Sequence, residues 1–330
     1  MPARNVTVAS LCTSCLLAAA LGTGCSEGSP SSAEAEKRAA APALSKAQAQ
    51  QVLDAYTAEA NRAGRKLDRT VLPGIEADPQ LSMDDASLKL RRVIKRPPPT
   101  VRFTNTSFYI PRVSGYPHWF AAGAVTGQGK RSMRHALLFT QAKAGAPWLL
   151  TANPYPTSDA LSNIALDPEG FATSVDADER KGLAAAPGKV PAAHAALLTD
   201  GPGAANASLM ADGAQTSETY KALKQGEKTL AGRGVTLSSR FSPSQYRVFA
   251  LRTKDRGALV WYVLKQNEAY SSSKRGRLAV GGDLLGLVPV KAARTRMDTT
   301  VLVQYLAAVP PKGRATVTGM YRKAVTAHGT

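Results

Sequence analysis

The sequence predicts an α+β protein made of two tandem units, each with helices followed by a curved antiparallel β-meander. Two observations carry this prediction. Apolar residues first recur at helical spacing, and after three consecutive prolines (97–99) their period changes to two, as in strands. The same order of patterns then occurs a second time along the chain. We therefore expect a first unit at residues 44–160 and a second at residues 161–330.

The first 24 residues have the layout of an export signal. A single basic residue, Arg4, precedes an apolar run near 11–21, and small residues then lead to Cys25. The run is too short and too interrupted for a membrane-spanning helix, which needs about 20 mainly apolar residues. We therefore expect residues 1–24 to be a lipoprotein signal peptide and Cys25 to be the lipid attachment site. The alternative is an ordinary secretion signal cut elsewhere, because Gly22 occupies the position where lipoprotein signals usually carry an apolar residue.

The cysteines and the segment that follows the signal agree with a lipid-anchored protein. All three cysteines (Cys12, Cys15 and Cys25) lie at or before the junction, so the folded body offers neither a disulfide nor a cysteine metal site. Residues 25–43 are rich in Ser, Ala, Glu and Pro and have no bulky apolar side chain before Leu44, which predicts a flexible tether. These features predict an extracytoplasmic protein, held at the cell membrane of a bacterial envelope by its lipid anchor.

Helices open the first unit. Ser45 and Gln48 have the spacing of a capping box, in which each side chain bonds the backbone N–H of the other residue. Apolar residues at helical spacing continue this helix to about Gly64. Two shorter helices are expected at 68–72 and 83–94. The strands of the first meander are expected at 101–110, 118–125, 135–140 and 147–152.

The second unit repeats this order. A strand or hairpin is expected at 164–175, and a turn at Lys254–Gly257 in which the glycine takes a positive φ. The expected helices are 176–184, 191–198 and 217–231. The expected strands are 235–241, 245–253, 258–266, 299–309 and 315–325.

The chain is strongly basic. It has 42 Lys and Arg against 24 Asp and Glu, a net charge of +18, and the excess extends over both units. Outside a bacterial cell this charge favours contact with anionic lipid headgroups or wall polymers, at about 1 kcal/mol for each basic residue close to such a surface. Nucleic acid is not expected as a partner of an exported protein. The alternative is that the charge serves general solubility.

No motif identifies a catalytic, cofactor or metal site. His118 and His135 are expected on neighbouring strands, but neither has a partner at metal-ligand spacing. Ser271 and Lys274 have the Ser-x-x-Lys spacing of penicillin-interacting enzymes without the companion elements. Residues 127–132 lack the first glycine of a phosphate loop and join two strands, so a hairpin is expected. We therefore expect no catalytic residue, no cofactor and no metal ligand.

Acidic, aromatic and arginine residues have ordinary structural interpretations. Asp84-Asp85 and Asp176/Asp178 are expected at helix starts, where carboxylates offset the helix dipole. Arg247 and Arg252 either form a basic stripe on one sheet face or are simply solvated. The larger aromatics either fill the core or line an apolar cleft: Trp119, Trp148, Trp261, Tyr56, Tyr109 and Tyr262.

Several segments resemble a known family when taken together. They are LSKAQAQQVLDAYTAEANRAG, FYIPR, HWFAA, NIALDPEGFAT, QYRVFALRTKDRGALVWYVL and VTGMYRKAV. Behind a lipoprotein signal, this series is similar to a family of secreted lipoproteins from high-GC Gram-positive, Streptomyces-like bacteria. The resemblance implies a domain of uncharacterised function over roughly residues 44–326 and brings no catalytic residues. The layout is also similar to the cone-shaped nuclear-transport-factor-2-like fold used twice, which serves enzymes and scaffolds alike.

Three functions are compatible with these features. The anchor, tether, basic body and lack of motifs favour a membrane-tethered, non-catalytic binding or scaffold module. The first alternative is an enzyme with a dispersed acid/base pair, Asp/His or Asp/Tyr, in a cone-shaped pocket. An open pocket with two convergent titratable side chains would favour that enzyme, and a filled core would count against it. The second alternative is an accessory subunit of an envelope or export complex.

Overall fold

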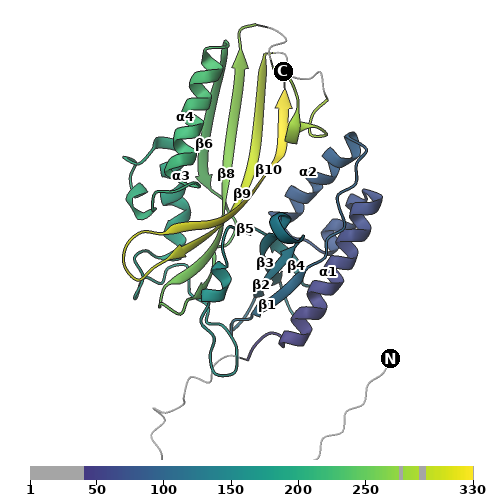
Figure 1. The fold of residues 1–330 in the computed structure, drawn as a ribbon, viewed down its shortest axis with the longest axis vertical. Coiled ribbons are helices and arrows are strands. Elements are labelled where there is room, and N and C mark those ends of the chain that lie inside the picture. Colours follow the sequence, from purple (N-terminus) through teal and green to yellow (C-terminus); the bar gives the residue numbers. More distant parts are fainter. Residues whose placement is uncertain (1–40, 275–277, 290–294, 330) are drawn as a thin grey trace, which may run out of the picture. The chain divides into compact units, whose positions relative to one another are not determined.

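Two antiparallel sheets, of four and six strands, organise the protein (Figure 1). The structure is a computed structural model that describes residues 41–274, 278–289 and 295–329. The predicted signal peptide and Cys25 lie outside the described residues, as does the predicted tether up to residue 40. The α+β class predicted from the sequence is confirmed.

Helices precede the four-stranded sheet. The elements are α1 (Lys46–Lys66), η1 (Arg69–Gly74), α2 (Gln80–Val93), β1 (Thr104–Tyr109), β2 (His118–Thr126), η2 (Gly129–Arg131), β3 (Met133–Gln141) and β4 (Leu149–Ala152). Strands β1 to β4 are neighbours in chain order, which makes this sheet a meander. The predicted capping box is confirmed: Ser45 Oγ accepts from Gln48 N at 3.2 Å, and Gln48 Oε1 accepts from Ser45 N at 2.7 Å. The helix continues past Gly64 to Lys66 and ends where Leu67 takes a φ of 53°.

The six-stranded sheet follows a second group of helices. The elements are β5 (Tyr155–Pro156), η3 (Ala160–Asn163), η4 (Pro187–Lys189), α3 (Val190–Asp200), η5 (Ala207–Leu209), α4 (Ser217–Ala231), β6 (Val235–Pro243), β7 (Phe249–Arg252), β8 (Ala258–Ser272), η6 (Gly282–Leu284), β9 (Arg296–Val309) and β10 (Thr316–Gly329). Their order is β5-β10-β9-β8-β6, and β7 pairs with β8. Helices α3 and α4 lie along one face of this sheet, and α2 lies on the other (Figure 1).

Two local predictions in the second half are wrong. Residues 176–184 form turns and bends in place of the expected helix, so Asp176 and Asp178 do not lie at a helix start. The backbone there bonds across to other segments, since Ala184 N donates to Pro310 O at 2.9 Å. In the turn after β7 the positive φ belongs to Arg256 (65°), one residue before the expected glycine. Glycine is needed at 257 for a different reason: a Cβ there would lie 2.6 Å from Val309 O.

The two halves share their cores, and residues 40–330 form one compact unit. Strand β5 belongs to the first predicted unit in sequence, yet it pairs with β10 of the six-stranded sheet. Met83 of α2 packs with Val263 and Leu302 of the same sheet. One core cluster combines Trp119 and Leu138 of the four-stranded sheet with residues of β7, β8 and β9.

Most of the large aromatics are core residues. Trp119, Trp261, Tyr109 and Tyr262 are buried. The buried Trp261 ring keeps its polar atom satisfied, because Nε1 donates to Ala136 O at 3.0 Å. The core interpretation is therefore confirmed for these four residues.

Candidate functional site

A cavity of about 150 Å³ lies between α1, α2 and the segment 98–101. Both helices contribute one face to it. Residues of α1 about one turn apart, Tyr56, Ala60 and Gly64, form one wall. Asp84, Ser87 and Leu88 project from α2 at the same kind of spacing, and Glu76 from the connection before α2 also lines the cavity. The lining is therefore mixed on α1, which contributes Tyr56 and Arg65 beside small residues, and acidic near α2.

The outer wall is an extended segment that is tightly held. Asn61 uses its whole amide for this: Nδ2 donates to Val101 O and Oδ1 accepts from Val101 N, both at 2.8 Å. Gly64 allows Pro98 to approach α1, because a Cβ at this position would lie 2.9 Å from Pro98 Cγ. The prolines that end the helical region in sequence thus become one side of the cavity.

A pair of carboxyl groups forms the chemical centre of the cavity. Glu76 is only 2% exposed, and Tyr56 Oη donates to its Oε1 at 3.3 Å. Glu76 Oε2 is buried and receives no hydrogen bond. Asp84 accepts from Gln80 Nε2 at 2.9 Å, and its carboxyl group is hydrogen-bonded to that of Glu76. Two carboxylates both lack a proton to donate, so this contact requires that one of them be protonated.

Hydrogen bonds determine which of the two buried carboxyl groups holds the proton. The pKa of Glu76 is raised well above its usual value, chiefly by burial and then by the charge and hydrogen bond of Asp84. Burial also raises the pKa of Asp84, but hydrogen bonds from Gln80 and Glu76 oppose that rise. We therefore assign the proton of the pair to Glu76. The pair then carries one negative charge.

The helix-start interpretation of Asp84-Asp85 is wrong. Helix α2 begins at Gln80, so both residues lie in its second turn, away from the dipole's positive end. Asp84 joins Glu76, while Asp85 forms ion pairs with Arg69 and with Lys89, the latter at 3.0 Å. Sequence reasoning missed Glu76 altogether, since a single glutamate in a connection gives no signal. The spacing of Gln80 and Asp84, one helical turn apart, was the available hint.

A buried polar network ties the carboxyl pair to both sheets. Gln304 Nε2 of β9 donates to Gln80 Oε1 at 2.9 Å, and Gln304 Oε1 accepts from Asn153 N at 2.6 Å. Asn153 Oδ1 lies 3.1 Å from His135 Nδ1, and His135 Nε2 lies 2.8 Å from Thr126 Oγ1. Burial lowers the pKa of His135 to about 4, so the ring is neutral and Nδ1–H is the donor to Asn153. The network fixes α2, and with it Asp84, relative to the strands.

The histidines of neighbouring strands do not meet. In the β2–β3 register His118 is opposite Gln141, while His135 is opposite Ala124 six residues further along β2. His118 stacks on Tyr116, with ring centroids 4.2 Å apart. Of the four histidines, His135 alone reaches the polar network.

The remaining sequence candidates have structural roles. Residues 127–132 connect β2 and β3 through η2, as a hairpin connection should. Ser271 lies at the end of β8, with Lys274 just beyond it. The basic-stripe interpretation is wrong: Arg252 forms an ion pair with Glu179, and Arg247 lies over the Phe249 ring, 5.6 Å from its centroid.

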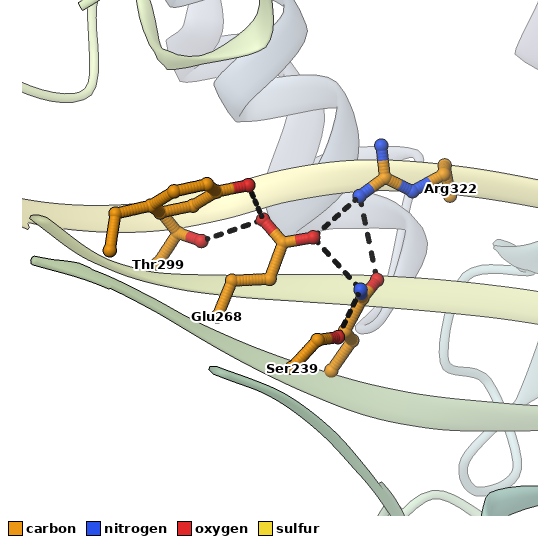
Figure 2. A network of polar contacts seen from close by, with 6 residues as sticks. Ser239, Glu268, Thr299 and Arg322 are labelled. Carbon is orange, nitrogen blue, oxygen red and sulfur yellow. Dashed lines mark hydrogen bonds and ion pairs between the residues drawn. The ribbon is translucent and has the colours of Figure 1, made fainter. Parts of the chain in front are cut away.

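A second acidic cluster provides a useful contrast. Figure 2 shows Glu268 on β8 with partners from its own strand and from β9 and β10. Its Oε2 accepts from Thr299 Oγ1 and Tyr270 Oη, each at 3.2 Å, and its Oε1 accepts from Gln266 Nε2 at 2.8 Å. Arg322 adds an ion pair at 3.4 Å. Both oxygens of Glu268 are therefore satisfied, whereas Glu76 keeps one oxygen without a donor.

Within the described ranges, no group of three or more His, Cys, Asp or Glu residues could hold a metal ion. A search of the same residues finds no helix long and apolar enough to cross a membrane.

The fold and the site define a mixed α+β protein with an acidic cavity between its first two helices. The chain belongs to the family described as a domain of unknown function (DUF8094), whose model matches residues 40–329. This confirms the resemblance to a family of uncharacterised domains.

The curated relatives are lipoproteins from Streptomyces. An uncharacterised lipoprotein of Streptomyces coelicolor is 28% identical over 261 residues, covering 75% of this chain and 73% of the relative. One of Streptomyces avermitilis is 28% identical over 255 residues, covering 74% and 72%. A second from Streptomyces coelicolor is 24% identical over 244 residues, covering 72% and 71%. No solved structure matches the chain, so the similarity in layout to nuclear-transport-factor-2-like cones stays a prediction.

Proposed function

We propose that this protein is a membrane-tethered, extracytoplasmic lipoprotein whose folded body is a non-catalytic binding module for a small polar ligand. The anchor is supported by the relatives, which are described as lipoproteins, and by Cys25 at the end of an export signal. We further infer that the two helix-then-meander segments are tandem units whose cores have merged.

The observation that carries the binding role is the unpaired oxygen of Glu76 beside Asp84 in the cavity. Leaving a buried polar atom without a partner costs about 1–3 kcal/mol, so the fold keeps this carboxyl group at the expense of stability. The cavity of about 150 Å³ is smaller than the roughly 300–1,000 Å³ of pockets for drug-sized ligands. Its ligand is accordingly a molecule of few atoms, or one small group of a larger molecule.

The enzyme alternative has an observation in its favour, because two titratable side chains do converge here. Two carboxyl groups that share a proton are the device of aspartic proteases. The nearly complete burial of Glu76 and the small cavity leave no room for a polymeric substrate, which favours binding over hydrolysis.

The basic charge supports a second contact, with anionic surfaces. At the end of α2 the exposed side chains of Val93 (48%) and Ile94 (43%) lie beside the basic residues Arg91, Lys95 and Arg96. In the described part of the chain these three basic residues have no ion-pair partner. Anionic lipid headgroups or wall polymers would supply the missing charge. An accessory role in an envelope complex is the remaining alternative, and a protein that copurifies with the membrane-bound chain would favour it.

The binding role is tested with a thermal-shift screen of small polar molecules on the full chain. We expect stabilising compounds whose effect disappears in Ser87→Leu, which fills the cavity, and persists in Ser82→Leu, a half-buried serine of α2 outside the cavity lining. Compounds that are consumed during incubation, as seen by NMR, would establish the enzyme alternative. Absence of any Ser87-dependent stabilisation would remove the binding role.

The anchor is tested separately by metabolic labelling with a fatty-acid analogue. The full chain is expected to carry the label and to stay with the membrane fraction. Cys25→Ala should lose the label and be released into the medium. Equal labelling of Cys25→Ala would exclude this cysteine as the attachment site.

A further inference from the structure

The cavity between α1 and α2 is lined by side chains of both charge signs. The carboxyl pair of Glu76 and Asp84 supplies a negative charge, and Arg65 of α1 supplies a positive one. Arg65 is exposed and makes no ion pair or hydrogen bond with other described residues. Ser87 also lines the cavity, and its hydroxyl has no hydrogen-bond partner among the residues described. The cavity is therefore lined both by hydrogen-bond acceptors and by donors that have no partner among the described residues.

We propose that the cavity binds a small zwitterion that carries an ammonium and a carboxylate group, as a free α-amino acid does. The ammonium lies at the carboxyl pair, and the carboxylate lies at Arg65 with Ser87 as a further donor. This inference rests on the proposed binding function and names the class of ligand for the same cavity.

An ammonium group suits the carboxyl pair better than a metal ion does. It has three N–H donors in a compact group, and the unpaired Glu76 Oε2 and the carboxyl oxygens of Asp84 are acceptors for them. A hard metal ion would require about six oxygen ligands, whereas the described residues contain no third His, Cys, Asp or Glu at the pair. The single negative charge of the proton-sharing pair matches one ammonium group.

Arg65 explains why the ligand carries a negative group as well. A ligand with only a positive charge would approach an unpaired guanidinium group of the same sign, which disfavours it. A carboxylate removes this repulsion, and a guanidinium group binds it with two parallel N–H···O hydrogen bonds. The two charges of the ligand therefore meet opposite charges at the two helices.

The size of the cavity restricts the side chain of such a ligand. A volume of about 150 Å³ equals that of about five water molecules, at about 30 Å³ each in the liquid. An amino acid as small as glycine or alanine, with about five or six non-hydrogen atoms, is of this size. Ala60, Leu72 and Leu88 provide apolar contact for a methyl group. We therefore use L-alanine as the probe.

The test compares L-alanine with its two single-charge analogues, ethylammonium and propionate, by isothermal titration calorimetry on the full chain. L-alanine is expected to bind at least ten-fold more tightly than either analogue. Glu76→Gln should weaken the binding of L-alanine ten-fold or more. Arg65→Gln should weaken the binding of L-alanine and of propionate but should leave the binding of ethylammonium unchanged. The matched control is Arg62→Gln, since Arg62 lies on the same helix, pairs with Glu59 and does not line the cavity.

Outcomes that contradict the zwitterion differ from those that contradict binding in general. If ethylammonium or an uncharged molecule binds in a Glu76-dependent way and L-alanine does not, the zwitterion is wrong and the binding module stands. Equal effects of Arg65→Gln and Arg62→Gln on L-alanine would also overturn it. If no molecule in the screen stabilises the protein through the cavity, both proposals fail together.

Discussion

Replacing Glu76 by glutamine tests the shared proton directly. In the unfolded chain a glutamate has a pKa of about 4.3, and in the fold the pKa of Glu76 is raised well above that value. Between these two values the folded state binds more protons than the unfolded state, so stability falls as pH rises. The contribution of Glu76 is therefore complete below the unfolded pKa and is lost as pH rises through the folded pKa. Glutamine is neutral at every pH and keeps an N–H donor for Asp84.

The size of the effect follows from the structure. Above the folded pKa, Glu76 Oε2 becomes a buried acceptor without a donor, which costs about 1–3 kcal/mol. We therefore expect Glu76→Gln to be more stable than the natural chain by about 1–3 kcal/mol at about pH 8, and nearly equal to it at about pH 4. For a body of this size the gain corresponds to a Tm increase of about 2–6 °C. The substitution keeps the hydrogen bond from Tyr56, because the hydroxyl that donates to Glu76 finds a carbonyl oxygen in glutamine as well.

Chemical denaturation followed from about pH 4 to about pH 8 measures this difference. Tyr56, Tyr155, Tyr321 and Lys323 also interact electrostatically with the pair, and Arg65 lines the same cavity. Because these groups are present in both proteins, the difference between the two stability curves isolates Glu76. The matched control is Glu268→Gln, in the cluster of Figure 2, where every carboxylate oxygen has a donor and Arg322 pairs with the charge. This control should lose about 1 kcal/mol at about pH 8. Parallel curves for Glu76→Gln and the natural chain, or a less stable Glu76→Gln at about pH 8, would refute the shared proton.

Three further predictions address the walls, the core and the surface. Asn61→Ala should lower stability by about 1–2 kcal/mol and speed amide exchange at Val101, because it removes both hydrogen bonds that hold the segment 98–101; unchanged exchange at Val101 would contradict this. Burial lowers the pKa of His194 to about 4, so the natural chain should lose stability as pH falls from about 6.5 towards 4. In His194→Gln the free energy of unfolding should depend less on pH over this range. An equal dependence on pH in both proteins would contradict this prediction. The triple variant Arg91→Gln, Lys95→Gln, Arg96→Gln should bind phosphatidylglycerol vesicles several-fold more weakly at low salt, with Lys221→Gln, Lys224→Gln, Lys228→Gln on α4 as the control; equal loss in both variants would show that the end of α2 has no special role.

Local sequence signals predicted elements well wherever a helix or strand carried its own cap and its own apolar pattern. Helix α4 has the predicted bounds 217–231, and α1 begins at the predicted capping box. Strand β8 runs six residues beyond its predicted end, to Ser272. Its last part is polar, so it has no alternating apolar signal, and it is held by the partners of Glu268 on neighbouring strands (Figure 2). Hydrogen bonds between residues distant in sequence stabilise this part of the strand, so it forms without the alternating apolar pattern from which a strand is predicted.

Local sequence signals could not predict the candidate site, because the residues that form it are distant from one another in the sequence. Asp84 was assigned to a helix start, since an acidic residue near a helix N-terminus has the same appearance whether it faces solvent or a buried carboxyl group. The partner that fixes its neighbour Gln80 is Gln304, 224 positions further along the chain. No local pattern relates two glutamines at that separation.

The contrast between the buried Glu76 and the half-buried Glu268 shows that the unpaired oxygen of Glu76 is not a general weakness of this fold. At Glu268 the chain satisfies both oxygens with a threonine, a tyrosine, a glutamine and an arginine (Figure 2). At Glu76 it provides one tyrosine and a second acid, next to a cavity and an uncommitted arginine. A glutamine at position 76 would remove the ionisable group at no cost in volume, so stability alone gives no reason to keep the acid. Residues that lower stability in this way are typical of functional sites, which agrees with the binding role that we propose for this cavity.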